Sequence, residues 1–122
     1  MKGIVLFAHG SRDPQWHRPI QAVAQRMSEL APHVPTRCAY LELTEPTLAE
    51  ATRALIAQGV RDVCIVPLFL GVGKHAREDL PNLVESLRQA HPDILIACQA
   101  SVGEQAPVID LLAHIALGLK PT

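Results

Sequence analysis

Residues 4–8, Ile-Val-Leu-Phe-Ala, form an uninterrupted apolar run that leads directly into His9. Two similar runs follow later in the chain, Val-Cys-Ile-Val at residues 63–66 and Ile-Leu-Ile-Ala at residues 94–97. Short apolar runs without polar alternation are typical of strands that are buried on both faces of a parallel sheet. The three runs therefore predict an α/β protein with helices on either side of its strands.

Amphipathic helical patterns separate these runs, with apolar residues spaced by three and four. The patterns cover residues 20–31, 48–55, 80–87 and 108–119, and a mixed run at residues 36–41 indicates an edge strand. Strand and helix thus alternate four times, which predicts a single α/β domain over residues 1–122. Right-handed crossovers favour a three-layer, flavodoxin-like fold, with a four-stranded parallel sheet of order 2-1-3-4 and helices on both faces.

Proline and glycine mark the expected ends of the helices. Gly59 follows the second helix, in the position of a left-handed C-terminal cap. Pro81 stands in or just before a first helical turn, where its missing N–H does least harm. We expect the third helix to begin near Arg77, so that His75 lies in a loop, and residues 120–122 to form a frayed tail.

The composition is that of an ordinary globular protein, with 48% hydrophobic and 19% charged residues and a formal charge of -1. This balance argues against a broad surface for nucleic acid or for an anionic membrane. No apolar run reaches the roughly 18 residues that span a bilayer, and the first is too short for a signal peptide. The three cysteines have no CxxC spacing, so we expect no disulfide framework and a cytoplasmic protein.

Ligands of open parallel sheets bind outside the carboxyl ends of the strands, so the residues that follow the strands are the candidates for function. His9 follows the first strand, Glu42 and Glu45 follow the second, and His75 follows the third. Imidazole and carboxylate together bind divalent first-row metals and move protons near neutral pH. The sequence therefore predicts a site at this edge, with neither a phosphate loop nor a G-x-S-x-G elbow.

Each of these residues also has a purely structural interpretation. His9 and His75 could be a helix-flanking and an exposed loop histidine, and Glu45 before Pro46 could stabilise a helix N-terminus. Glu42 is then the better candidate for the site. The remaining histidines are interpreted as solvated surface residues: His17, His33, His91 and His114.

Positive charges surround the same edge of the predicted sheet. Arg12, Lys74 and Arg77 form either a solvated face or a site for a substrate with several carboxylates.

Four segments resemble the small CbiX-type sirohydrochlorin chelatases, class II chelatases of tetrapyrrole biosynthesis. They are Ala-His-Gly-Ser-Arg-Asp-Pro at residues 8–14, residues 41–46 with Glu42 and Glu45, Val-Pro-Leu-Phe-Leu at 66–70, and Gly-Lys-His-Ala-Arg-Glu-Asp-Leu-Pro at 73–81. The similarity runs from residue 3 to about residue 118. Lys74 stands where the family commonly has a second glycine before the histidine.

The resemblance implies insertion of a divalent metal into sirohydrochlorin without ATP, cobalt for cobalamin, iron for sirohaem, or nickel in a related branch. The metal (Co²⁺, Fe²⁺ or Ni²⁺) is then a substrate, and no cofactor is permanently bound. It further implies the following roles: His9, His75 and Glu42 catalytic, His9 and His75 metal-binding, and Ser11, Arg12, Lys74 and Arg77 substrate-binding.

Two further interpretations use the same features. A tetrapyrrole or metal carrier would bind both ligands without turnover, and a flavodoxin-like receiver or FMN module would need a phosphate loop or an acidic cluster after the first strand. A macrocycle on a single module would leave one of its faces open to water, so we expect a homodimer. The apolar residues between 108 and 119 form a stripe that either packs on the sheet or supplies a dimer interface.

Overall fold

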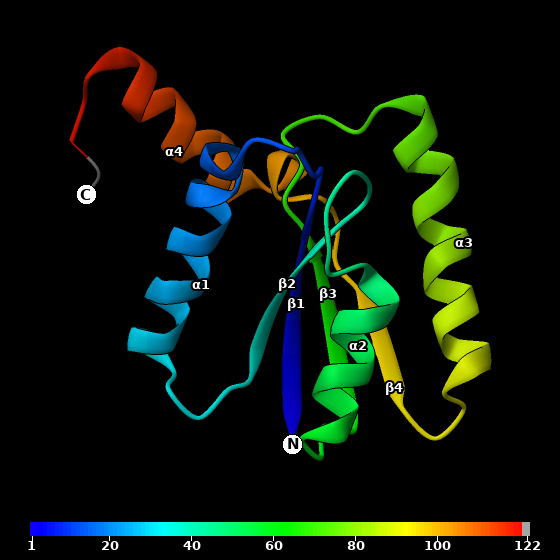
Figure 1. Cartoon of the computed structure of the whole chain (residues 1–122). Helices are drawn as coiled ribbons and strands as arrows, with labels where there is room; N and C mark the ends of the chain where they lie inside the picture. The colour runs from blue at the N-terminus through cyan, green and yellow to red at the C-terminus, as the bar shows by residue number, and fades with distance from the viewer. Residues whose placement is uncertain (121–122) are drawn as a thin grey trace.

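Four parallel strands pair in the order β2-β1-β3-β4, as the crossover argument predicts. The computed structural model describes residues 1–120, and Figure 1 shows its strands side by side at the centre of the molecule. Their bounds are Lys2–Ala8 for β1, Thr36–Tyr40 for β2, Asp62–Pro67 for β3 and Leu95–Cys98 for β4. Because the strands are parallel, their carboxyl ends and the loops that follow them all lie at one edge of the sheet.

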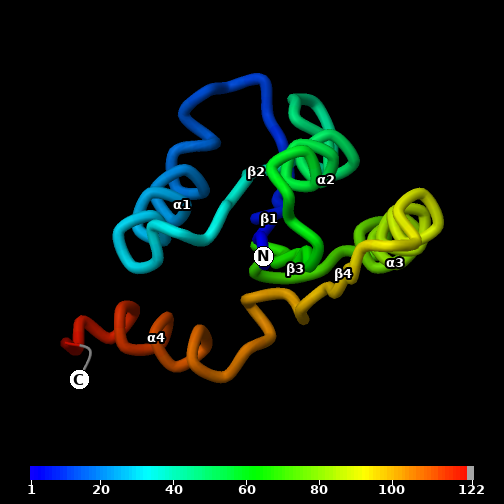
Figure 2. The backbone as a smooth tube through the Cα atoms, turned by 90° about the horizontal axis from the view of Figure 1, so that it is seen from below, coloured from blue at the N-terminus to red at the C-terminus, as the bar shows by residue number. Residues whose placement is uncertain are grey.

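Helices lie on both sides of the sheet, α1 and α4 on one side and α2 and α3 on the other, as Figure 2 shows. Their bounds are Arg18–Leu30 for α1, Leu48–Ala57 for α2, Lys74–Ala90 for α3 and Ala106–Leu117 for α4, with short 3₁₀ helices η1 at Pro14–His17 and η2 at Val102–Glu104. The three-layer α/β fold is thereby confirmed. Of the expected tail at residues 120–122, only Lys120 is among the described residues.

The sheet separates two apolar clusters of unequal size. The larger lies under α2 and α3 and is built around fully buried Phe7, Leu55 and Ile65. The smaller lies under α1 and contains Leu6 and Ile20. Since alternate residues of β1 enter opposite clusters, the run that opens the chain holds both layers to the sheet.

Helix α4 does not contribute to either cluster. None of its residues is buried, and within residues 1–120 its main packing is against η2. The expectation that residues 108–119 could pack as a core stripe on their own sheet is therefore wrong. The chain leaves the body of the molecule at η2, as Figures 1 and 2 show.

The start of α3 also differs from the expectation. The helix begins at Lys74, with Gly73 in extended conformation as its N-cap, so His75 lies in the first turn and not in a loop. Pro81 lies inside the helix instead of at its start. The first turn is solvent-exposed apart from Ala76, so no apolar periodicity marks it in the sequence. Gly59, by contrast, has a positive φ of 98° directly after α2, as predicted.

The cysteines behave as small apolar residues. All three are free thiols, with Cys64 buried and Cys38 and Cys98 half-buried. Burial raises the pKa of the Cys38 and Cys98 thiols, which disfavours the thiolate. Within residues 1–120, no helix combines the length and the apolarity that crossing a membrane requires.

Candidate active site

His9 and Glu42 meet at the carboxyl edge of the sheet. His9 follows the last residue of β1, and its Nδ1 lies 3.1 Å from Glu42 Oε1 and 3.4 Å from Oε2. The side chains are 48% and 40% exposed. An exposed pair of this kind stabilises a fold by at most about 1 kcal/mol. The loops must therefore be held in place by other contacts, and the pair is free to serve a ligand.

Backbone hydrogen bonds fix the loop that carries Glu42. Leu41 N–H donates to Ala8 O at 2.9 Å, which extends the pairing of β2 with β1 beyond the strand itself. Tyr40 N–H donates to Pro46 O at 2.9 Å and closes the loop at its base. Together these bonds place the Glu42 side chain opposite the first residue after β1.

Gly10 allows the two loops to approach closely. It is buried, and a Cβ built on it would lie only 1.9 Å from the Glu42 carbonyl oxygen. Real Cβ atoms do not approach a backbone oxygen this closely, so a side chain at this position would force the loops apart. A glycine directly after His9 is therefore required for His9 and Glu42 to lie this close together.

Trp16 holds His9 from the other side. Its indole Nε1–H donates to the His9 carbonyl oxygen at 3.0 Å, from the 3₁₀ helix η1. The sequence interpretation did not include this residue. Two features of the sequence could have drawn attention to it: Trp16 is the single tryptophan of the chain, and it lies only seven residues beyond His9.

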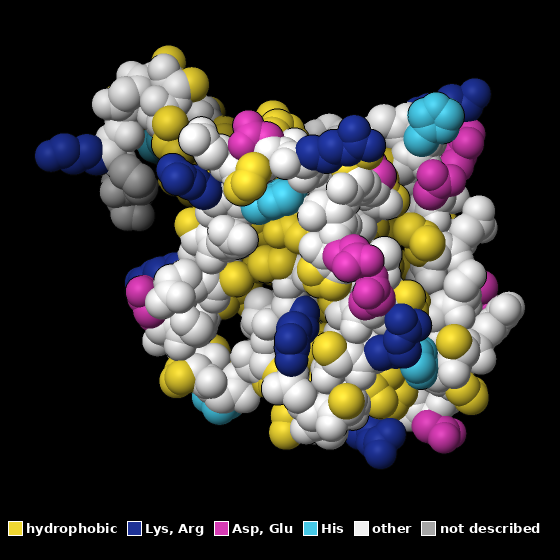
Figure 3. Space-filling view, viewed as in Figure 1, with side chains coloured by type: hydrophobic (Ala, Val, Ile, Leu, Met, Phe, Trp, Pro, Cys, Tyr) yellow, Lys and Arg dark blue, Asp and Glu magenta, His cyan; other side chains and the backbone are white. Residues whose placement is uncertain are grey.

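A cleft of about 420 Å³ opens beside His9. Aromatic and aliphatic side chains form most of its wall, and the His9 ring lies 4.8 Å from the ring of Phe69. Its lining includes His9, Trp16, Ile20, Leu68, Phe69 and Leu70. Figure 3 shows hydrophobic side chains gathered between α1 and the loops that follow the strands. The arrangement suits a flat, largely apolar ligand whose polar centre faces an imidazole.

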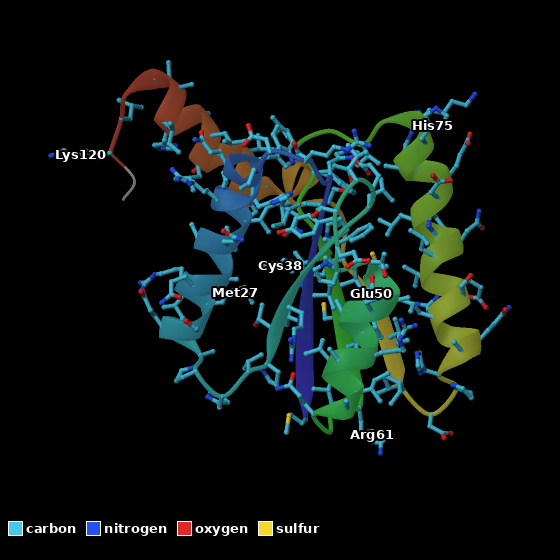
Figure 4. The ribbon with its side chains drawn as sticks, in the orientation of Figure 1. Met27, Cys38, Glu50, Arg61, His75 and Lys120 are labelled. Atoms are coloured by element: carbon cyan, nitrogen blue, oxygen red, sulfur yellow. The ribbon has the colours of Figure 1, made fainter. Side chains whose placement is uncertain are left out.

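His75 lies apart from this pair. Figure 4 shows it at the upper end of α3, on the same edge of the sheet but on the outer helix. Within residues 1–120 it forms no ion pair with Glu42, and no cluster of three or more His, Cys, Asp or Glu side chains could hold a metal ion. Of the predicted site residues, the structure therefore brings together His9 and Glu42. His75 lies at the periphery of the same edge of the sheet, which we call the rim.

The residues predicted to bind substrate also lie at this rim. Arg12, Lys74 and Arg77 are exposed, and none of them forms an ion pair within the described chain. Arg77 lines a second cleft, of about 530 Å³, between α3 and the end of β4. Ser11 Oγ accepts a hydrogen bond from Asp13 N–H at 3.0 Å, so it also shapes the loop after β1.

Of the four histidines interpreted as solvated surface residues, His17, His91 and His114 are half-buried, and His17 is the one packed against a neighbouring ring. His17 is half-buried, its ring lies 4.5 Å from the ring of Tyr40, and its buried Nε2 has no partner among the described residues. The sequence interpretation is wrong here because η1 folds back over the end of β2. His33 is exposed as expected.

The histidine–carboxylate pair and the apolar cleft lie at the carboxyl edge of an open parallel sheet, where α/β proteins of this class bind their ligands. The chain belongs to the CbiX family, whose sequence profile matches residues 3–116.

Similar proteins agree with this assignment. A sirohydrochlorin cobaltochelatase of Methanopyrus kandleri is 32% identical over 84 residues, which cover 69% of this chain and 59% of that protein. A crystal structure described as a CbiX protein of cobalamin (vitamin B12) biosynthesis, from Marinobacter aquaeolei VT8, is 30% identical with a TM-score of 0.80, over 97% of this chain and 93% of the other.

A double-length relative is also similar. The sirohydrochlorin chelatase SirB of Bacillus subtilis subspecies spizizenii, solved in complex with cobalt, is 25% identical with a TM-score of 0.78. The match covers 96% of this chain but 50% of SirB. The chain thus spans about half of SirB and about three fifths of the Methanopyrus protein.

The contact between Gly10 and the Glu42 carbonyl gives a direct prediction. Gly10→Ala should lower the free energy of unfolding by about 1–3 kcal/mol, because the added methyl group overpacks two backbones. Gly71→Ala is the matched control, since a Cβ there meets nothing within 4 Å and Gly71 is exposed. Urea unfolding of both variants measures the difference. Equal stabilities for the two variants would contradict the close approach.

Proposed function

We propose that this protein inserts a divalent metal into sirohydrochlorin without ATP, with cobalt as the first candidate metal and iron as the second. The observation that carries the proposal is the His9–Glu42 pair, held 3.1 Å apart beside an apolar cleft. The similarity to sirohydrochlorin chelatases supports the choice of substrate. Either cobalamin or sirohaem synthesis would use such a product.

His9 can bind the metal through its second ring nitrogen, Nε2. An ionised carboxylate only accepts hydrogen bonds, so Nδ1 supplies the hydrogen of the bond to Glu42. In the neutral ring Nε2 then keeps its lone pair, and the carboxylate orients the ring as it does for many metal-bound histidines. A single imidazole nitrogen with its orienting carboxylate leaves most metal positions open, so a metal can pass from it to the macrocycle.

Metal insertion must also remove two protons. The balance is M²⁺ plus the macrocycle with its two pyrrole N–H groups, giving the metallated macrocycle and two H⁺. His9 is placed to accept one of these protons, and the half-exposed Glu42 can pass a proton to solvent. His75 is proposed as the second histidine, and the exposed glycines Gly71 and Gly73 precede it in the chain.

The apolar cleft suits the conjugated ring of the substrate, and the positively charged rim suits its peripheral carboxylates. The apolar wall with Trp16 and Phe69 can contact the conjugated ring. Ser11, Arg12, Lys74 and Arg77 are proposed to meet the peripheral carboxylates, for which guanidinium groups are well suited. Because the protein has a formal charge of only -1, this attraction must come from local placement and not from the total charge.

The proposal includes a homodimer in the cytoplasm. A single module offers one edge to the macrocycle, and a second copy would cover the face that remains open to water. The half-length match to SirB supports this arrangement, because one chain there holds two such lengths. Free cysteines are usual in the reducing cytoplasm.

A tetrapyrrole or metal carrier with the same fold is the second candidate function. It would use the same cleft and the same His9–Glu42 pair. Anaerobic incubation with sirohydrochlorin and Co²⁺, followed by absorption, distinguishes the two: a chelatase converts many equivalents of macrocycle per protein, whereas a carrier stops at one.

His9 and Glu42 should both be needed for turnover. We expect His9→Ala and Glu42→Gln each to slow cobalt insertion at least tenfold, equivalent to about 1.4 kcal/mol in the barrier. Glu45→Gln and His33→Ala are matched controls, because both residues are exposed and lie outside the pair. Wild-type rates for the two site variants would remove the pair from the reaction.

The positive rim should act on substrate binding more than on turnover. Replacing Arg12 and Arg77 together by Gln should raise KM for sirohydrochlorin several-fold, and added salt should do the same to the wild type. Lys2→Gln with Arg61→Gln removes the same charge at the opposite edge of the sheet, where Figure 4 shows Arg61. An effect on kcat alone, or an equal effect of the control pair, would contradict the proposed role.

A further inference from the structure

Trp16, the single tryptophan of the chain, lies at the surface beside His9. Its side chain is 54% exposed, although tryptophan is highly buried on average, so it is not a core residue here. Its ring lines the apolar cleft, and its Nε1–H donates to the His9 carbonyl oxygen at 3.0 Å. Because one side chain both forms the cleft and bonds to His9, Trp16 is a candidate for a role in the reaction.

The His9 carbonyl lies just beyond the strand pairing of β1. The carbonyl before it still belongs to the sheet, since Ala8 O accepts a hydrogen bond from Leu41 N–H at 2.9 Å. Within residues 1–120, the His9 carbonyl accepts its hydrogen bond from the Trp16 indole and not from a neighbouring strand. The indole therefore restrains the backbone at the first residue that the sheet no longer holds.

Gly10 makes this restraint important for the direction of the imidazole. Glycine permits a wider range of backbone torsions than other residues, so it does not by itself fix the peptide plane that it shares with His9. The hydrogen bond from Trp16 holds the carbonyl oxygen of that plane. The 3.1 Å separation of His9 Nδ1 from Glu42 Oε1 depends on the same backbone.

The short helix η1 holds the indole in place. Asp13 is its N-cap, and the Asp13 carbonyl accepts a hydrogen bond from Trp16 N–H at 3.0 Å. The next residue, His17, packs its ring 4.5 Å from the ring of Tyr40 at the end of β2. Contacts on both sides of Trp16 in the sequence therefore fix the segment that carries the indole.

We infer that Trp16 is a positioning residue for the proposed metal insertion, and that the two parts of its side chain act on different steps. The indole N–H holds His9 in the orientation that bonds to Glu42, and so acts on turnover. The ring forms part of the cleft wall, and so acts on binding of the macrocycle. The inference rests on the proposed chelatase function and adds a residue to its site.

The tautomer of the His9 ring reports this role directly. In a neutral imidazole, the hydrogen bond made by one ring nitrogen decides which nitrogen carries the hydrogen. The bond to Glu42 keeps the hydrogen on Nδ1 and leaves the lone pair of Nε2 for the metal. When the N–H of Trp16 is removed and His9 is released from Glu42, a larger fraction of the rings should carry the hydrogen on Nε2.

Three changes at Trp16 separate the N–H from the ring. Trp16→3-benzothienylalanine places sulfur where the indole has its N–H, so it keeps the size of the ring and removes only the donor. Trp16→Phe keeps an aromatic wall without the donor, and Trp16→Ala removes both. Gln15→Ala is the matched control, because Gln15 is an exposed neighbour in η1 whose side chain forms no hydrogen bond within residues 1–120. Circular dichroism verifies the fold of each protein.

Without the donor, kcat for cobalt insertion should fall about three- to tenfold, the effect expected for one net hydrogen bond. KM for sirohydrochlorin should change by less than about twofold in Trp16→3-benzothienylalanine, because the wall of the cleft is kept. Trp16→Ala should raise KM several-fold as well, and Gln15→Ala should match the wild type in both constants. A wild-type kcat in the proteins without the donor would overturn the inference.

Nitrogen-15 NMR of the histidine rings at about pH 8, where an ordinary imidazole is neutral, gives the tautomer without any substrate. The His9 signal is identified by its absence in His9→Ala. It should show the hydrogen on Nδ1 in the wild type and in Gln15→Ala, and a mixture of tautomers in Trp16→3-benzothienylalanine. A tautomer that does not change with the donor would overturn the positioning role. A wild type that inserts no cobalt would contradict the proposed function, whereas a tautomer shift in the same protein would still support the hold of Trp16 on His9.

Discussion

The close approach of Gly10 to the Glu42 carbonyl is the constraint on which the site depends. It brings the loop after β1 against the loop after β2, and the His9–Glu42 pair follows from it. The pair itself is half-exposed and adds little to stability. The two backbones are held instead by β1–β2 pairing that continues through Leu41 N–H to Ala8 O. The geometry is therefore set before any ligand arrives.

A second glycine plays the same part on the other side of the cleft. Gly103 packs against the Leu70 carbonyl, and Leu70 lines the cleft beside His9. This contact also sets the direction in which the chain enters α4. The segment that shapes one wall of the cleft is thus the segment from which the unpaired helix leaves the body. The direction of α4 and the shape of the cleft are connected through this one loop contact.

Much of the fold could be predicted from the sequence, because the strands are apolar runs and their order follows from crossover handedness. Glu42 could be preferred to Glu45, and the structure places Glu42 beside His9. The start of α3 could not be predicted, since its first turn is exposed and Gly73 offers no side-chain cap. Trp16 was missed because its hydrogen bond to the His9 carbonyl depends on how η1 folds back. The direction of α4 depends on backbone contacts of η2, which apolar periodicity does not encode.

The proposed reaction requires His9, oriented by Glu42, to hold the metal before it enters the macrocycle. X-ray absorption spectroscopy of the anaerobic protein with one equivalent of Co²⁺ tests this claim most directly. The account predicts a first shell of nitrogen and oxygen with the outer-shell scattering of imidazole, which is lost in His9→Ala. A sulfur ligand from one of the three cysteines, or an unchanged spectrum in His9→Ala, would contradict it.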